Sequence, residues 1–222
     1  MCGRYSLYAD MHFIQEEFDI TIPKTLPQRF NIAPSQNVLV ITSDGRTRKA
    51  EMHRWGLIPF WAKDPKIGYK MINARAETVD EKASFRGPLK NKRCLVIADG
   101  FYEWKREDKQ KQPFHIRLKN RKPFAFAGLW DQWEQNGEVI TSCTHITTRP
   151  NALMKDLHDR MPVILTKEAE ESWLDPSIQD NEYLKSLLTP YDSEQMEAFE
   201  VSPVVNSPRH DVKDCVVPLL NF

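Results

Sequence analysis

The sequence predicts an α+β fold, formed as one domain over residues 1–222, with a largely antiparallel, barrel-like β core flanked by a few short helices. Many short runs of strand length are present, and hairpin turn signals stand at Asp44-Gly45 and Asn136-Gly137. Strands and helices do not alternate regularly, so a β-α-β architecture is disfavoured. No internal repeat or long flexible linker divides the 222 residues, a length that suits a single domain.

The first half of the chain predicts one helix and one hairpin. Asp10 is placed to cap a short helix whose apolar residues recur at helical spacing as far as Phe18. Residues 37–42, NVLVIT, have the pattern of a strand. The first hairpin turn follows, so we expect a second strand that leads into Trp55.

The second half predicts most of the remaining core. A continuous apolar run over residues 94–99 is typical of a buried strand. Further strands are expected at 113–118, 123–130, 138–147, 162–165, 199–201 and 216–219. Helical patterns cover 167–174 and 181–188, and the prolines at 176 and 190 stop them.

Composition is that of an ordinary soluble globular protein, with 41% apolar and 28% charged residues. Neither a membrane-spanning run nor a cleavable signal is evident, so we expect a cytoplasmic protein that does not bind membranes. The cysteines are widely spaced and form no C-x-x-C motif, which favours free thiols. They are Cys2, Cys94, Cys143 and Cys215. No interface signal appears, and we expect a monomer.

Charge is balanced overall but unevenly distributed along the chain. The net charge is zero, which argues neither for nor against a nucleic-acid partner. Residues 86–122 hold twelve Lys or Arg against four Asp or Glu, whereas residues 166–200 hold two Lys against ten Asp or Glu. Solvated surface explains both segments, and a phosphate-facing surface explains the basic one equally well.

Four short strings hold polar groups among apolar or turn-forming neighbours, where a simple core strand would not have them. They are MCGRYS at 1–6, INARAET at 72–78, ADGFYEW at 98–104 and HDRMP at 158–162. Together they offer the thiol of Cys2, the amide of Asn73, the carboxylate of Glu103 and the imidazole of His158. Metal-ligand spacing, Walker and dinucleotide motifs are absent, so we expect no metal and no cofactor.

Cys2 has the most specific chemistry, provided that Met1 is removed. The α-amine and the thiol, with reference pKa values of about 7.7–8.0 and about 8.5, are then each partly nucleophilic at pH 7. Such an aminothiol prefers an aldehyde, because the amine forms an imine and the thiolate closes onto it as a thiazolidine. From the dipeptide alone, a small packed residue in an N-terminal strand is the commoner outcome.

Each of the other three candidates has a structural alternative. Glu103, between two aromatic residues, suits acid–base chemistry with a raised pKa or a solvent-facing strand position. His158 suits a proton shuttle near neutral pH or a hydrogen-bonded helix terminus. Asn73 suits a contact with substrate or with the Cys2 amine, or else a turn or strand edge.

At these strings the sequence resembles the SOS-response-associated peptidase (SRAP) family. Seven motifs match in order over nearly the whole chain, which makes a chance match improbable. They are MCGR at the N-terminus, RFNIAPSQ (29–36), RWGLIPFWAKD (54–64), INARAET, SFRGPLKNKRCLVIADGFYEWK (84–105), QPFHI (112–116) and LHDRMPVIL (157–165).

The resemblance implies a barrel-like α+β fold, single-stranded DNA as partner, and covalent capture of abasic sites, whose ring-opened sugar is an aldehyde. It places the catalytic groups at Cys2, Asn73, Glu103 and His158. It places phosphate contacts and residues that shape the DNA groove at Arg4, Arg75, Arg160, Asn31, Pro34 and Trp61.

The sequence departs from the family in the DNA-contacting region. Some members carry two adjacent tryptophans where this chain has Trp61-Ala62. A basic contact after INARAET has no clean equivalent here, although Lys82 and Arg86 lie close. These departures put strand contacts in that region in doubt.

The working hypothesis is that the protein crosslinks to abasic single-stranded DNA in the cytoplasm, and on the nucleoid when it is bound. The Cys2 amine attacks C1′ of the sugar, His158 helps to open the sugar ring, and Glu103 handles protons at the imine. Asn73 orients the amine. The rivals are a cysteine peptidase that uses Cys2 with His158, in its narrowest form only to remove its own Met1, and a non-covalent reader of modified or single-stranded DNA.

Overall fold

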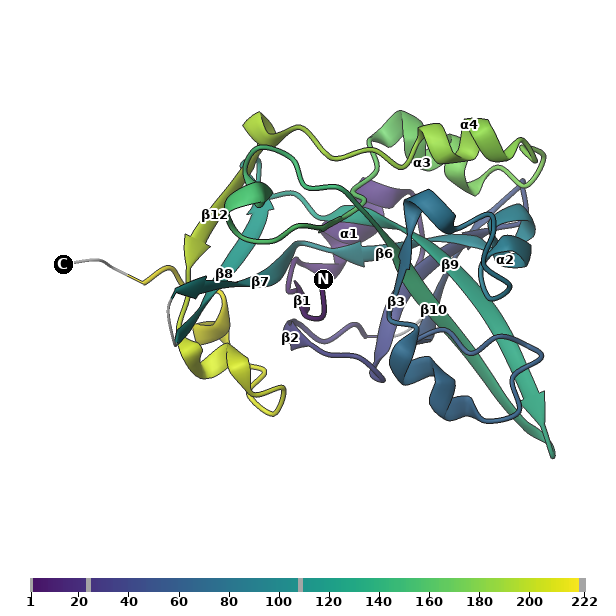
Figure 1. The fold of residues 1–222 in the computed structure, drawn as a ribbon, viewed down its shortest axis with the longest axis horizontal. Coiled ribbons are helices and arrows are strands. Elements are labelled where there is room, and N and C mark those ends of the chain that lie inside the picture. The colour runs from purple at the N-terminus through teal and green to yellow at the C-terminus, as the bar shows by residue number, and fades with distance from the viewer. Residues whose placement is uncertain (1, 23–24, 108–109, 220–222) are drawn as a thin grey trace.

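A computed structural model describes residues 2–22, 25–107 and 110–219, which form two β-sheets with short helices around them (Figure 1). The strands are β1 (Tyr5–Leu7), β2 (Arg29–Ile32), β3 (Asn37–Ser43), β4 (Arg48–Trp55), β5 (Asn73–Arg75), β6 (Arg93–Ala98), β7 (Gly100–Glu107), β8 (Gln110–Leu118), β9 (Phe124–Gln135), β10 (Glu138–Thr148), β11 (Met161–Pro162) and β12 (Met196–Glu200). The α-helices are α1 (Met11–Phe18), α2 (Arg86–Asn91), α3 (Lys167–Leu174) and α4 (Asn181–Ser186).

Five strands of the larger sheet close into a barrel. Strand β3 pairs with β4 and β6, β6 pairs with β9, and β9 pairs with β10, all antiparallel. Strand β10 then returns to β4 in a short parallel pairing, with Cys143 opposite Trp55, which completes the ring. This ring confirms the predicted α+β fold with a largely antiparallel, barrel-like core.

The second sheet carries the start of the described chain. Its strand order is β12-β8-β7-β1-β2, and all of its pairings are antiparallel. Tyr5 of β1 lies opposite Phe101 of β7 on one side and Ile32 of β2 on the other. Strand β1 therefore runs through the interior of the molecule, and Figure 1 shows it near the centre of the view.

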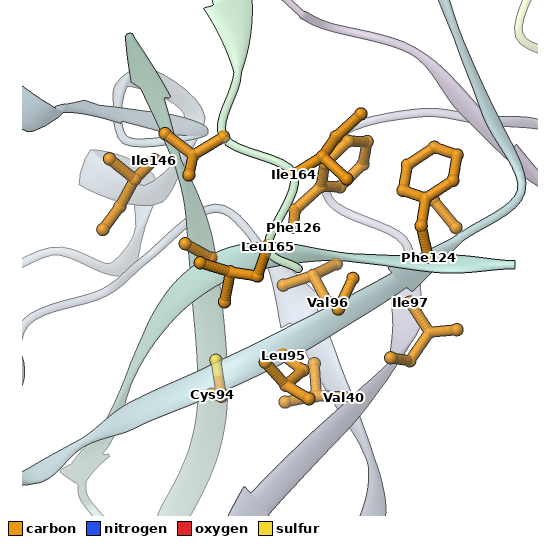
Figure 2. Close-up of a cluster of buried hydrophobic side chains, with 14 of the residues drawn as sticks. Val40, Cys94, Leu95, Val96, Ile97, Phe124, Phe126, Ile146, Ile164 and Leu165 are labelled. Atoms are coloured by element: carbon orange, nitrogen blue, oxygen red, sulfur yellow. The ribbon is translucent and has the colours of Figure 1, made fainter. Parts of the chain in front are cut away.

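One continuous apolar core joins the two sheets. Tyr5 and Phe101 of the second sheet belong to the same buried cluster as Val40 and Phe126 of the barrel. Figure 2 shows the apolar side chains of β6 and β9 gathered with Ile164 and Leu165, which follow β11. Full burial of each such side chain stabilises the fold by roughly 1.5–3 kcal/mol.

Local capping explains where helix α1 begins and ends, as the sequence predicts. The Asp10 carboxylate accepts the His12 N–H at 2.8 Å. Ile14 and Phe18 are fully buried, and Asp19 ends the helix in the left-handed conformation with φ 49°.

Two expected strands near the C-terminal end are wrong or shorter than predicted. Residues 216–219 form no strand, and Pro218 makes only an isolated bridge to Val201. The expected strand at 162–165 shrinks to Met161–Pro162, after which Ile164 makes a single bridge to Phe126. Proline lacks an N–H and so interrupts the ladder in both places.

Arg93, at the start of β6, ties the barrel to the helices that cover it. Its side chain is 6% exposed and donates five hydrogen bonds of 2.5–3.1 Å to backbone carbonyls. The acceptors are Leu89, Lys90, Trp173, Asp175 and Ile178. Most of them lie at the C-terminal ends of α2 and α3, where the helix dipoles favour a cation.

We expect Arg93→Met to lower the free energy of unfolding by about 4 kcal/mol, because several buried carbonyls lose their donor at once. Urea denaturation followed by tryptophan fluorescence measures this loss. Lys90→Met is the matched control, since Lys90 is exposed on the same helix end. A loss below about 1 kcal/mol for the arginine variant would show that water replaces these bonds.

Candidate active site

Cys2 lies just before β1 and is fully buried in the core that both sheets share. Its carbonyl oxygen accepts a hydrogen bond from Asn73 Nδ2 at 2.9 Å and lies 3.4 Å from His145 Nε2. Its thiol donates to the Arg4 carbonyl oxygen, with a sulfur–oxygen distance of 3.7 Å. Backbone and side chain of Cys2 are thus both held in place.

Asn73 reaches Cys2 because β5 pairs in parallel with β10. Asn73 lies opposite His145, and Ala74, which is buried, lies opposite Ile146. The preceding backbone is tied down by the Trp55 indole, which donates to the Ile72 carbonyl at 2.9 Å. Asn73 is therefore a strand residue, in line with the strand-edge alternative, and its side chain also contacts Cys2.

Glu103 lies on β7 and is only 3% exposed, so a solvent-facing position is wrong. Burial raises the pKa of the Glu103 carboxyl to about 7, and the nearby charge of Asp159 adds to the effect. Its charge in turn raises the pKa of the Cys2 thiol, after the larger effect of burial. A carboxyl group with this pKa exchanges protons readily near neutral pH.

The thiol of Cys2 is less ionised than its reference pKa suggests. Burial, and secondly the charge of Glu103, raise the pKa of the Cys2 thiol well above its usual range. The reference value applies to a thiol in water, whereas this sulfur has no exposed surface. The neutral thiol of Cys2 is therefore favoured over its thiolate in the fold.

A cavity of about 680 Å³ opens beside these groups. Glu103, His158 and Arg4 all line it, together with Trp104 and the lysines at 105, 111 and 155. His158 Nδ1 lies 3.0 Å from the Arg160 N–H and 2.7 Å from an Asp159 carboxylate oxygen. The neutral ring accepts from the first of these, and the protonated ring donates to the second, so His158 has a partner in either state.

Arg4 and Asn31 form one unit on the far wall of this cavity. Arg4 Nη1 donates to Asn31 Oδ1 and to the Val205 carbonyl, both at 2.8 Å. The Asn31 side chain is fully buried, and its amide donates to the carbonyls of Val205, Ser207 and His210. The structure therefore places Arg4 at the cavity and Asn31 behind it, as its support.

Arg75 and Arg160 lie together at the end of β10. Arg75 is exposed and lies opposite Thr147, whose carbonyl accepts from Arg160 Nη2 at 2.6 Å. Arg160 also forms a two-pronged ion pair with Glu77, at 2.8 and 2.9 Å. Glu77 therefore neutralises Arg160 in this structure, whereas Arg75 faces solvent. Lys82 is exposed shortly after this segment, and so is Arg86.

Trp61 is 48% exposed on a loop after β4, and Phe60 beside it is 68% exposed. Ala62 is buried, and its carbonyl accepts from the Trp133 indole at 2.7 Å. Some family members carry a second tryptophan after this position. In this chain the second exposed aromatic residue is Phe60, which precedes Trp61. Pro34 is half-buried in the turn that joins β2 to β3. Trp61 lines a separate cavity of about 530 Å³ with the lysines at 63, 66 and 70, so it does not line the cavity at Glu103 and His158.

Two glycines hold the Trp61 loop against the segment that follows it. Gly56 has a φ of 123°, and a Cβ there would lie 2.6 Å from the Gly68 carbonyl oxygen. A Cβ on Gly68 would in turn lie 2.7 Å from the Gly56 carbonyl oxygen. Only glycine at both positions allows this close backbone contact.

Sequence reasoning missed His145 and the cavity wall formed by Trp104 and the three lysines. His145 stands inside an apolar strand, and its spacing from the other His and Cys residues gives no metal-ligand pattern. A histidine in the middle of a buried strand was the available signal. Within the described ranges, no cluster of three His, Cys, Asp or Glu is arranged to hold a metal ion, and no helix has the length and apolarity to cross a membrane.

Comparison with known proteins identifies the family. The model of the family "SOS response associated peptidase (SRAP)" matches residues 1–208. The Bacillus subtilis "Abasic site processing protein YoqW" is 53% identical over 97% of this chain and 99% of its own length, and the Pongo abelii "Abasic site processing protein HMCES" is 34% identical over 99% and 76%. A crystal structure of a Bacteroides thetaiotaomicron protein is 32% identical and superposes with a TM-score of 0.90, covering 99% of this chain and 100% of that one. This chain therefore belongs to the SRAP family.

Proposed function

We propose that this protein processes abasic sites in single-stranded DNA by capturing them covalently through Cys2. The names of its relatives support abasic-site processing. The observation that carries the chemistry is the contact of the half-buried Asn73 with the Cys2 carbonyl at 2.9 Å, together with the Glu103 carboxyl group, whose pKa is about 7. A fixed aminothiol beside a proton-exchanging group is suited to aldehyde capture.

The reaction starts from the free α-amine that removal of Met1 leaves on Cys2. His158, on the cavity wall, moves a proton at the sugar ring oxygen as the abasic sugar opens to its aldehyde. The amine nitrogen attacks C1′, and the resulting hydroxyl leaves as water when the imine forms. Glu103 accepts the proton that the amine releases and returns it to the departing hydroxyl.

Ring closure completes the capture. The Cys2 sulfur bonds to C1′, and its proton passes through Glu103 to the former imine nitrogen, so that one water is lost overall. Because burial keeps the Cys2 thiol protonated, Glu103 must act as its base at this step. The same carboxyl group can protonate the thiazolidine and so promote reversal of the link.

In this proposal the DNA strand runs across Arg75, Arg160 and Arg4. These arginines contact its phosphates, which positions the strand without reading its base sequence. Trp61 stacks on a base, an interaction worth roughly 1–3 kcal/mol in single-strand binding proteins. The protein acts in this way as a monomer in the cytoplasm, and on the nucleoid when it is bound to DNA.

We expect Arg75→Ala to weaken binding of single-stranded DNA at low salt and to reduce the slope of log K against log [salt] by about 0.7, the value for one phosphate contact. Fluorescence anisotropy with an oligonucleotide at several salt concentrations measures both. Arg46→Ala is the control. Arg46 lies in the turn before β4, and the site lies at the other end of this strand, which is about 23 Å long. An unchanged slope for Arg75→Ala would remove this residue from the interface.

The test of the proposal is a denaturing gel. Purified protein is incubated with a single-stranded oligonucleotide that carries one abasic site, or with the same oligonucleotide carrying a tetrahydrofuran analogue that has no aldehyde. We expect a slow-migrating, heat-stable adduct only with the former, and its mass should equal protein lacking Met1 plus DNA minus one water. An adduct that retains Met1, or no adduct at all, would refute covalent capture by the aminothiol.

The peptidase alternative uses Cys2 differently. A cysteine peptidase needs an imidazole that withdraws the thiol proton. Among the contacts of the described residues, the Cys2 sulfur bonds to a backbone carbonyl, and the imidazole of His145 meets the Cys2 carbonyl instead.

A further inference from the structure

We propose that His145 is a positioning residue that holds Cys2, together with Asn73, in the orientation that ring closure requires. The inference rests on the proposed capture reaction. It concerns the step at which the thiol adds to the imine. His145 touches neither sulfur nor cavity, and it acts through the backbone of Cys2.

The two side chains approach one carbonyl oxygen from neighbouring strands. Asn73 on β5 and His145 on β10 lie opposite each other in the parallel pairing. Asn73 Nδ2 lies 2.9 Å and His145 Nε2 3.4 Å from the Cys2 oxygen. A carbonyl oxygen has two lone pairs, so both donors can be accepted at the same time.

The surroundings of the ring determine which nitrogen carries the proton. His145 is fully buried, and its ring centre lies 4.9 Å from that of Trp55 and 5.1 Å from that of Phe126. Within the described part of the chain, Nδ1 has no hydrogen-bond partner. Burial lowers the pKa of His145 to about 4, so the ring is neutral at pH 7 and has one N–H. On Nε2 this proton reaches the Cys2 oxygen, whereas on Nδ1 it would stay unpaired.

Two hydrogen-bond donors restrain the orientation of the Cys2 peptide group more than one donor does. With Asn73 alone, the Cys2 peptide plane is free to turn about a single hydrogen bond. The second donor removes this freedom, and the Cα substituents, amine and thiol, then point in fixed directions. Ring closure needs the sulfur about 3–3.5 Å from the imine carbon, and small misplacements slow such steps strongly.

A slower ring closure has a chemical signature, because the imine then lives longer. An imine at C1′ acidifies the protons on C2′. Loss of one of these protons to a base breaks the C3′–O bond, and the phosphate leaves with the electron pair, so that the DNA strand is cut. The ratio of heat-stable crosslink to cut strand therefore reports how fast the thiol closes the ring.

The experiment compares His145→Leu and His145→Gln with wild-type protein, using labelled abasic single-stranded DNA in single-turnover reactions. Leucine removes the donor, and glutamine places an amide N–H near the position of Nε2. We expect the crosslink-to-cleavage ratio to fall about tenfold in the leucine variant, the effect of one lost hydrogen bond, and to recover in the glutamine variant. Borohydride, which reduces the imine to a stable amine, should trap correspondingly more adduct from the leucine variant.

Controls separate this role from simple stability. His53→Leu removes another buried histidine, which packs on Trp130 in the barrel, and should leave the ratio unchanged. Affinity for DNA with the tetrahydrofuran analogue should be the same in all variants. If the leucine variant unfolds, His145→Asn replaces it, because its amide is one methylene too short to reach the Cys2 oxygen.

The outcomes are distinguishable. An unchanged ratio in a folded His145→Leu or His145→Asn protein overturns the positioning role and leaves the capture reaction intact. Equal loss in the glutamine and leucine variants also overturns it, since the donor would then not matter. A wild-type protein that forms no crosslink overturns the capture reaction itself, and the positioning role with it.

Discussion

Replacing Cys2 with serine is expected to reduce formation of the heat-stable crosslink on the order of 1000-fold or more. The serine variant keeps the α-amine, so the imine still forms. Its hydroxyl group is a far weaker nucleophile than a thiol, so the ring does not close. We therefore expect borohydride-trappable imine and increased strand cleavage in place of the stable adduct.

The measurement is a heated denaturing gel with and without borohydride, on abasic single-stranded DNA. Cys94→Ser is the matched control, because Cys94 is equally buried, in β6, and lies outside the cavity. A crosslink that persists at wild-type yield in the Cys2→Ser protein would contradict the thiazolidine assignment. Mass spectrometry of the N-terminal peptide must accompany the gel, because the comparison holds only if the Cys2→Ser protein has also lost Met1.

Glu103→Gln is expected to slow crosslinking at least about 100-fold, the usual contribution of a general acid–base group. The pKa of Glu103 is about 7, so the fraction of ionised carboxylate rises through neutral pH. Because the ionised form accepts the proton from the amine, the ratio of wild-type to variant rate should rise up to about pH 7 and level off above it. Single-turnover rates between pH 5.5 and 8.5 measure this ratio. A ratio that does not change with pH would remove Glu103 from the proton transfers.

The same substitution is expected to stabilise the protein at alkaline pH. The pKa of Glu103 is raised in the fold from 4.5 to about 7, so the native state binds the proton more tightly than the unfolded state. Stability is therefore lost as pH rises from about 4.5 to 7, by about 3 kcal/mol in total at 1.4 kcal/mol per pH unit. Glutamine removes this loss, so the variant should be more stable than wild type at pH 8 and equal to it at pH 4.

Thermal unfolding at the two pH values provides the comparison. Glu182→Gln on the exposed side of α4 is the control and should be neutral at both. Gain of stability together with loss of activity is typical of a group that is buried for function. A Glu103→Gln protein that is less stable at pH 8 would mean that the ionised carboxylate is well solvated in the fold.

The barrel was predictable because its strands are local features. The hairpins at Asp44-Gly45 and Asn136-Gly137 combine turn residues with flanking apolar runs, and both formed as expected. Strand β2 was not expected, and β1, β5 and β7 were expected only as the structural alternatives for Cys2, Asn73 and Glu103. The strands β1, β2 and β5 have only three or four residues each. Short segments that carry polar site residues lack the alternation on which strand prediction depends.

The site was predictable in its chemistry but not in its geometry. The motifs named Cys2, Asn73, Glu103 and His158, and the structure brings Asn73 to the Cys2 carbonyl and places Glu103 and His158 on one cavity. The burial of Asn31 behind Arg4 was not visible in the sequence, since asparagine is usually exposed. The catalytic and DNA-binding roles of these residues stay predictions for the experiments above.

By itself the sequence determined the chemical groups of this protein, the five barrel strands and the two hairpin turns, because these depend on residue type and on near neighbours. Only the tertiary structure decided how the groups meet. Asn73 and His145 reach Cys2 across 71 and 143 positions of chain, through the pairing of β5 with β10. The raised pKa values of Cys2 and Glu103 likewise follow from burial, which is a property of the whole packed core and of no single segment.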